Sequence, residues 1–147
     1  MLFETKQREY AVIAVLELAR VYRSKRPLSA RKIAAKYGFS QNFLTQVLQR
    51  LKEANLVEAV RGPLGGFKLI PAPEELTVGY VVGLFDEPEA ASKRSKSKVT
   101  SDAERTKAKL EDVWKIAEAK RREYLNSILY SDLLHEPDEQ EPLDFSI

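Results

Sequence analysis

Apolar residues in the first part of the chain recur at intervals of three and four, which is the spacing of one face of an α-helix. This pattern predicts three helices, at residues 4–23, 30–37 and 40–55. The first contains no glycine or proline and carries a wide apolar stripe. Gly38 lies between the other two, where a left-handed residue can end one helix before the next begins. A short helix, a tight turn and a second helix with a polar outer face form the helix-turn-helix pattern.

The spacing changes from helical to strand-like directly after the third predicted helix. Residues 56–60 and 67–70 are predicted to form two strands joined by a glycine-rich hairpin loop. Such a hairpin behind a helix-turn-helix corresponds to the wing of a winged-helix domain. A short apolar helix over residues 78–85 completes a predicted DNA-binding domain that spans residues 1–85.

The C-terminal part of the chain has a different composition and predicts three further segments. Residues 86–101 are polar and charged, and they are predicted to form a flexible loop. A capping box then opens a long helix over residues 102–130, and an acidic tail follows at residues 131–147. A helix so long and so loosely tethered is expected to pair with a second copy, although packing back on its own domain is the alternative. The residues predicted for the dimer interface are Leu110, Val113, Trp114, Ala117, Tyr124, Leu125 and Ile128.

The outer face of the third predicted helix carries amides and hydroxyls near its start and basic residues further along. Amide and hydroxyl side chains can hydrogen-bond base edges, while basic residues bind phosphate. The alternative is a winged helix used for protein contacts, in which these are ordinary solvated positions. The candidate DNA contacts from this helix are Ser40, Gln41, Asn42, Phe43, Thr45, Gln46 and Arg50.

Arg61 stands at the entry to the hairpin loop, followed by several glycines that allow the backbone to approach a duplex closely. An arginine in this position can enter a narrow minor groove. Gly65 and Gly66 are included as candidate contacts, with the alternative that they only supply the geometry of the hairpin. The loop is not a phosphate-binding loop, because it lacks the following lysine and hydroxyl residue and the strand-to-helix context.

Polar and basic residues also crowd the start of the first helix, where the positive end of the helix favours anions. Phosphate contacts are therefore candidates here, and a solvated helix terminus explains the same residues equally well. The residues concerned are Thr5, Lys6 and Arg8, together with Ser29, the cap of the second helix.

Charge is distributed unevenly along the 147 residues, although the formal net charge is only +2. Residues 1–73 hold 13 lysines and arginines against 5 acidic residues, whereas residues 124–147 hold 6 acidic residues and no basic one. A basic N-terminal half indicates a polyanionic partner such as double-stranded DNA. The single histidine and the lack of any metal-ligand spacing argue against an enzyme. No signal peptide or membrane span is recognisable, so a cytoplasmic location is expected.

Several motifs together resemble the Rrf family of bacterial winged-helix transcription regulators. The matching residues are 6–12 (KQREYAV), 28–29, 33–34, 40–51 (SQNFLTQVLQRL), 56–57, 60–67 (VRGPLGGF) and 77–79 (TVG). The resemblance implies a homodimer that binds a near-palindromic operator with one recognition helix per half-site, and it favours a repressor. It also implies that Arg61 faces the minor groove. The fold class that follows is mainly α with a small β-hairpin, a winged helix-turn-helix domain plus a long C-terminal dimerisation helix.

The chain departs from the family pattern in one important respect, since many members hold an iron–sulfur cluster through three cysteines. This sequence contains no cysteine, so no cofactor is expected. The chain is more similar to a cluster-free branch of the family. Members of that branch repress sulfur and cysteine metabolism and use the enzyme cysteine synthase as their sensor partner. Acidic tails that end in isoleucine enter the active site of that enzyme, and this tail ends at Ile147. A chance match is the alternative, because a terminal isoleucine is common.

Overall fold

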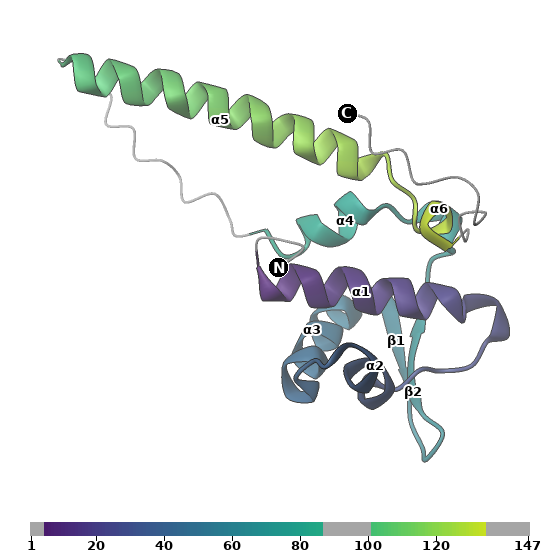
Figure 1. The fold of residues 1–147 in the computed structure, drawn as a ribbon. Coiled ribbons are helices and arrows are strands. Elements are labelled where there is room, and N and C mark those ends of the chain that lie inside the picture. Colours follow the sequence, from purple (N-terminus) through teal and green to yellow (C-terminus); the bar gives the residue numbers. More distant parts are fainter. Residues whose placement is uncertain (1–4, 87–100, 135–147) are drawn as a thin grey trace, which may run out of the picture.

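The computed structural model describes residues 5–86 and 101–134 of the chain. These residues form helices and one two-stranded antiparallel sheet, which confirms the predicted fold class (Figure 1). The helices and strands, with two 3₁₀ turns, are α1 (Lys6–Arg20), η1 (Tyr22–Ser24), α2 (Ala30–Tyr37), α3 (Gln41–Glu53), β1 (Val57–Val60), β2 (Gly66–Leu69), η2 (Pro73–Glu75), α4 (Val78–Gly83), α5 (Asp102–Asn126) and α6 (Tyr130–Leu134).

Local capping residues place most of the helix boundaries where the sequence predicts them. The hydroxyl oxygens of Ser29, Ser40 and Thr77 each accept a hydrogen bond from the backbone N–H three residues further on. Gly38 ends α2 in the left-handed conformation with φ 67°, and Asn55 follows α3 with φ 60°. The helix-turn-helix is therefore determined by short-range chemistry.

Helix α1 differs from its prediction, because it is buried on most sides and not along one stripe. It lies between the helix-turn-helix and hairpin below and α4 and α6 above in the view of Figure 1. Thr5 caps its start, so the helix begins two residues later than predicted, and it ends at Arg20. Its buried residues are Tyr10, Ala11, Val12, Ala14, Val15, Glu17, Leu18 and Ala19.

The hairpin is joined to the rest of the domain by a short extended segment before α2. Strands β1 and β2 pair in antiparallel register from Val57 opposite Leu69 to Val60 opposite Gly66. Leu28 forms an isolated antiparallel bridge with Phe67 of β2. Its N–H donates to the Phe67 carbonyl at 3.0 Å, and its carbonyl accepts from the Phe67 N–H at 2.9 Å. This bridge fixes the wing beside the start of α2.

Helix α5 packs on the domain with its C-terminal half, and its N-terminal part projects away from the body (Figure 1). None of its residues is buried. The contact with α4 is very close, since a Cβ added to Gly79 would lie 2.0 Å from the side-chain oxygen of Asn126. Leu125 and Ile128 are half-buried against the domain core, so these two predicted interface residues pack within their own chain.

The chain turns back after α5 and enters the core of the first domain. The backbone N–H of Val78 donates to the carbonyl of Ile128 at 2.9 Å, and the N–H of Tyr130 donates to the carbonyl of Leu76 at 3.0 Å. The Tyr130 side chain is completely buried, and its hydroxyl donates to the carbonyl of Val12 at 3.4 Å. Residues 128–134 are thus part of the fold of the winged-helix domain.

Replacing Tyr130 by alanine is expected to lower the free energy of unfolding by about 3–5 kcal/mol, because a large ring is removed from a fully buried site. Tyr130→Phe keeps the ring and is expected to cost about 1 kcal/mol or less, since the hydroxyl bond is long. Chemical denaturation of the two variants measures the difference. Equal stability of Tyr130→Ala and the parent chain would show that α6 is not part of the core.

Candidate nucleic-acid interface

Helix α3 presents one apolar and one polar face, as predicted for a recognition helix. Its inward side chains are almost completely buried against the domain core, and they are Leu44, Val47, Leu48 and Leu51. Its exposed side chains include Gln41, Asn42, Thr45, Gln46 and Arg50. Burial of one face fixes the rotation of the helix about its axis, so the amide side chains point outward from a rigid support.

An aromatic cluster holds the start of α3 against α1. The Tyr10 ring stacks on Phe39 with centroids 3.8 Å apart and meets the edge of Phe43 at 5.0 Å. The hydroxyl of Tyr10 accepts a hydrogen bond of 2.9 Å from the backbone N–H of Ser40. Phe43 is half-buried in this cluster. Its ring therefore helps to position the helix, and a contact between Phe43 and DNA stays a prediction.

Lys6 comes from α1 but lies beside the start of α3. Its Nζ atom is 5.1 Å from the centroid of the Phe43 ring and 5.5 Å from that of Tyr10. An exposed cation next to the leading end of α3 is well placed to bind a phosphate that flanks the bases. Tyr10 brings the two helices together. The sequence placed Tyr10 at the start of the first helix, within the matching stretch 6–12, but it did not predict this contact with α3.

Two other predicted contacts on α3 already have partners within the chain. The Thr45 hydroxyl donates to the carbonyl of Gln41 at 2.8 Å, which leaves its oxygen as an acceptor. The guanidinium of Arg50 lies 4.8 Å from the centroid of the Phe85 ring, near the end of α4. Arg50 stays exposed. It links α3 to α4, however, and lies at the opposite end of α3 from Lys6.

The two glycines of the wing are explained by close backbone packing. A Cβ on Gly65 would lie 2.1 Å from a backbone carbonyl oxygen within the hairpin, and one on Gly66 would lie 2.5 Å from the carbonyl carbon of Leu28. These distances favour hairpin geometry over direct DNA contact as the reason for Gly65 and Gly66. Arg61, by contrast, is exposed at the entry to the loop.

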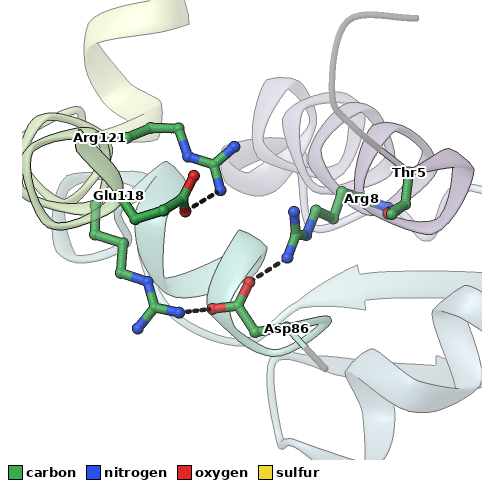
Figure 2. Close-up of polar contacts among 6 residues, drawn as sticks. Thr5, Arg8, Asp86, Glu118 and Arg121 are labelled. Carbon is green, nitrogen blue, oxygen red and sulfur yellow. Dashed lines mark hydrogen bonds and ion pairs between the residues drawn. The ribbon is translucent and has the colours of Figure 1, made fainter. Parts of the chain in front are cut away.

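Thr5 and Arg8, which the sequence grouped as candidate phosphate contacts, have different roles at the start of α1. The Thr5 hydroxyl caps the helix by accepting from the Arg8 backbone N–H at 3.3 Å. The Arg8 side chain is only 11% exposed and forms an ion pair with Asp86 at the end of α4 (Figure 2). The second carboxylate oxygen of Asp86 pairs with Arg122 of α5 at 3.1 Å. Arg8 therefore joins α1 to α4 and α5, and the predicted phosphate contact of Arg8 is not supported.

The start of α2 contributes cations that were not predicted as contacts. The half-buried Ser29 hydroxyl accepts from the Lys32 backbone N–H at 3.2 Å and so acts as a cap. Arg31 and Lys32, which follow it, are exposed. The signal in the sequence was their position two and three residues after a capping serine, in the first turn of the helix-turn-helix and in the basic half of the chain.

A buried carboxylate fixes α2 against α1. Glu17 is 7% exposed, accepts a hydrogen bond from the Tyr37 hydroxyl and receives Lys36 Nζ at 3.0 Å. Burial acts to raise the pKa of Glu17, but the hydrogen bonds from Tyr37 and Lys36 outweigh it and hold the pKa below its ordinary value. The charged form of Glu17 is thus favoured by the fold.

The fold and the exposed polar face of α3 define a winged helix-turn-helix protein of the regulator class. The chain belongs to the Rrf2 family, whose profile is described as an iron-dependent transcriptional regulator and matches residues 4–136. This confirms the resemblance seen in the sequence and the expectation of a regulator in place of an enzyme. Among the helices that the structure describes, none combines the length and the apolar character needed to cross a membrane.

Several relatives and solved structures are similar to this chain. The regulator IscR of Aliivibrio salmonicida is 37% identical over 89 residues, which cover 60% of this chain and 52% of that protein. The chain thus spans about half the length of that relative. IscR of Erwinia tasmaniensis is 30% identical over 131 residues, 89% of this chain and 78% of the relative. The structure of T. potens IscR has a TM-score of 0.71 at 26% identity, covering 90% of this chain and 85% of that one.

A second similar structure is that of CymR, the global cysteine regulator of B. subtilis. It has a TM-score of 0.71 at 25% identity, and the match covers 94% of this chain and all of that one.

The tail of the present chain, including Ile147, lies outside the described residues. The expected contact between that tail and cysteine synthase therefore stays a prediction.

The iron dependence in the family description has no matching set of ligands among the side chains that the structure describes. The sequence supplies no cysteine thiolate. Within residues 5–86 and 101–134, no group of three or more histidine, cysteine or acidic side chains is arranged to hold a metal ion. A thiolate-bound iron–sulfur cluster therefore has no ligands in this chain.

Replacing Glu17 by glutamine is expected to lower the free energy of unfolding at pH 7 by about 1–3 kcal/mol, because hydrogen bonds to a charged group are lost. The pKa of Glu17 is lower in the folded chain than in the unfolded one. Its stabilisation is therefore present above the unfolded pKa of about 4.3 and is lost as the pH falls through the folded value. Denaturation curves of both proteins measured from pH 7 to pH 3 should converge at the acidic end, and parallel curves would contradict this account.

Proposed function

We propose that this protein is a DNA-binding transcription regulator whose helix α3 enters the major groove. The observation that carries the proposal is the outward set of amides on α3, supported from behind by four buried apolar residues. Gln41, Asn42 and Gln46 are exposed, and asparagine and glutamine can form paired hydrogen bonds with adenine in the major groove. A rigid backbone under these amides is needed for sequence discrimination, because base contacts depend on fixed direction.

Exposed cations on α1, α2 and the wing loop support phosphate binding. Lys6 lies beside the start of α3, Arg31 and Lys32 begin α2, and Arg61 begins the wing loop. Residues 1–73 carry an excess of eight positive charges, 13 basic against 5 acidic residues. Such an excess favours a duplex over an acidic or neutral protein surface. Arg61 is proposed to enter the minor groove next to the site of α3.

The exposed apolar side chains of α5 support a homodimer. Five large apolar residues of this helix are 58–67% exposed, and they are Leu110, Val113, Trp114, Ile116 and Tyr124. Exposed apolar residues gathered on one helix indicate a partner surface. A second copy on this stripe would present two α3 helices related by a two-fold axis. The proposed operator is therefore near-palindromic, with half-sites separated by about one turn of DNA, and repression is the expected outcome of its occupancy.

Asn42→Ala and Arg61→Ala are each expected to weaken binding to DNA upstream of the protein's own gene by about 5–150-fold, because each removes a groove contact. Arg105→Ala is the matched control, since it removes an exposed positive charge on α5, far from α3. It should change affinity less than two-fold. Gel shifts at several salt concentrations provide the measurement.

The parent chain should also lose affinity steeply as salt increases, because binding releases counterions from DNA. Binding that is insensitive to salt, or unchanged in Asn42→Ala and Arg61→Ala, would contradict the proposal. It would favour the alternative of a winged helix that contacts proteins.

Val113→Asp is expected to weaken self-association by at least about ten-fold, because it places a charge in the proposed apolar interface. Leu64→Asp is the control, since Leu64 is 89% exposed at the tip of the wing and outside the stripe. Sedimentation at several protein concentrations measures the dimer dissociation constant. Equal dissociation constants for the parent chain and Val113→Asp would rule out this stripe as the interface.

A further inference from the structure

A cleft of about 890 Å³ lies between the start of α1, the end of α4 and the middle of α5. Its volume is in the range of sites that bind small molecules. Three separate elements contribute to its wall, so its shape depends on how α5 is placed relative to the winged-helix domain. Its lining includes Thr5, Arg8, Asp86, Trp114, Arg121 and Arg122.

Cations predominate in this cleft and point toward its centre from two directions. Arg8 enters from α1 and Arg121 from α5 (Figure 2). Arg122 of α5 also lines the cleft and pairs with Asp86. Lys115 adds a fourth positive charge to the lining, whereas Asp86 and Glu118 are the only acidic residues among those described there. Four cations against two carboxylates leave the described lining with an excess of positive charge. The N-terminal end of α1 adds to it, because that end of a helix dipole is positive.

Asp86 occupies the centre of this charge cluster. One of its oxygens pairs with Arg8 and the other with Arg122 at 3.1 Å, so a single carboxylate joins two arginines from different helices. Glu118 is engaged separately, with Arg121 at 2.8 Å within α5. A carboxylate held between two guanidinium groups shows that the cleft accommodates an anion at this position.

Trp114 lines the mouth of the cleft and is 67% exposed in the single chain. The part of its surface that faces away from the cleft belongs to the proposed dimer interface. An exposed indole next to several cations provides an apolar face beside a charged centre. A ligand with an acidic group and an apolar or aromatic part would match both features. Inorganic ions alone would use only the charged half of the cleft.

We propose that this cleft binds a small organic anion whose carboxylate or phosphate group replaces Asp86 between Arg8 and Arg122, with its apolar part against Trp114. The proposal goes beyond DNA binding and does not depend on it, because the cleft is formed by residues outside the exposed face of α3. It assigns the protein an effector site built on arginines.

The position of Asp86 connects this site to the proposed recognition helix. Asp86 directly follows Phe85, which is 4% exposed and packs under the Arg50 guanidinium of α3 at 4.8 Å. Release of Asp86 from Arg8 and Arg122 would loosen the link between α5 and the end of α4. Through Phe85 and Arg50, that change reaches α3. An anion could thus alter the relation between the dimerisation helix and the helix that contacts DNA.

The binding test uses the full chain without DNA, so its result is independent of the proposed DNA-binding function. Trp114 is the only tryptophan in the sequence and serves as an internal fluorescent reporter. The probes are succinate, phosphoserine, phenyl phosphate and inorganic phosphate, each titrated at constant ionic strength with sodium chloride as the reference. A saturable change in Trp114 emission is expected with at least one organic probe, and calorimetry should give the same dissociation constant.

Variants distinguish a binding site from a purely structural ion-pair cluster. Asp86→Asn is expected to increase affinity for the probe by several-fold, because it removes the internal anion that competes for the two arginines. A purely structural role of Asp86 would not produce such an increase. Arg122→Gln should weaken binding at least ten-fold, and Arg105→Gln on the same helix should change it less than two-fold.

The proposal would be overturned by an emission change that sodium chloride reproduces, or by the lack of saturation at millimolar concentrations of every probe. Equal losses in Arg122→Gln and Arg105→Gln would also overturn it, since they would indicate general charge screening. Unchanged or weaker binding in Asp86→Asn, in a variant that unfolds at the same denaturant concentration as the parent, would show that Asp86 does not compete with the probe.

Discussion

The burial of helix α1 on most of its sides determines how the rest of the structure is arranged. Because the helix is surrounded, polar groups along its length have to find partners on the elements that pack on it. Tyr10 accepts from Ser40, Glu17 binds Tyr37, and the carbonyl of Val12 accepts from Tyr130. These contacts fix α3, α2 and α6 in turn. One central helix therefore sets the positions of the helix-turn-helix and of the segment that returns from α5.

This arrangement divides the molecule into a rigid part and a part with fewer internal contacts. The helix-turn-helix has a buried apolar face, capped ends and an aromatic cluster at the start of α3. Helix α5 has no buried residue, and its main contacts with the domain are made by its C-terminal end and by the Asp86 cluster. A rigid recognition surface and an exposed apolar helix are the properties expected of a regulator that recognises DNA as a dimer.

The family is described as iron-dependent, yet this chain has no cysteine thiolate that could bind an iron–sulfur cluster. The region between α1, α4 and α5 contains instead an ion-pair cluster centred on Asp86 (Figure 2). Arginines hold carboxylates and phosphates through paired hydrogen bonds, and they do not bind iron.

The sequence by itself determined most of the helices and both strands of this protein, although α5 ends at Asn126 and a separate helix α6 follows it. Ser29, Ser40 and Thr77 cap helices, Gly38 and Asn55 end them, and these roles depend on neighbours within a few residues. The apolar spacing of α3 also indicated which of its faces is exposed. Such features can be predicted because their causes are local.

Only the tertiary structure decided which long-range partners each side chain has. From the sequence, Arg8 was a candidate phosphate contact, but its side chain pairs with Asp86, 78 residues further along the chain. Phe43 followed the cap of the recognition helix, but its ring completes the cluster around Tyr10. Tyr130 was assigned to the end of the dimerisation helix, and it packs beside Val12, 118 residues earlier in the chain. Periodicity shows which side of an element is buried, whereas the packing of distant elements determines what it is buried against.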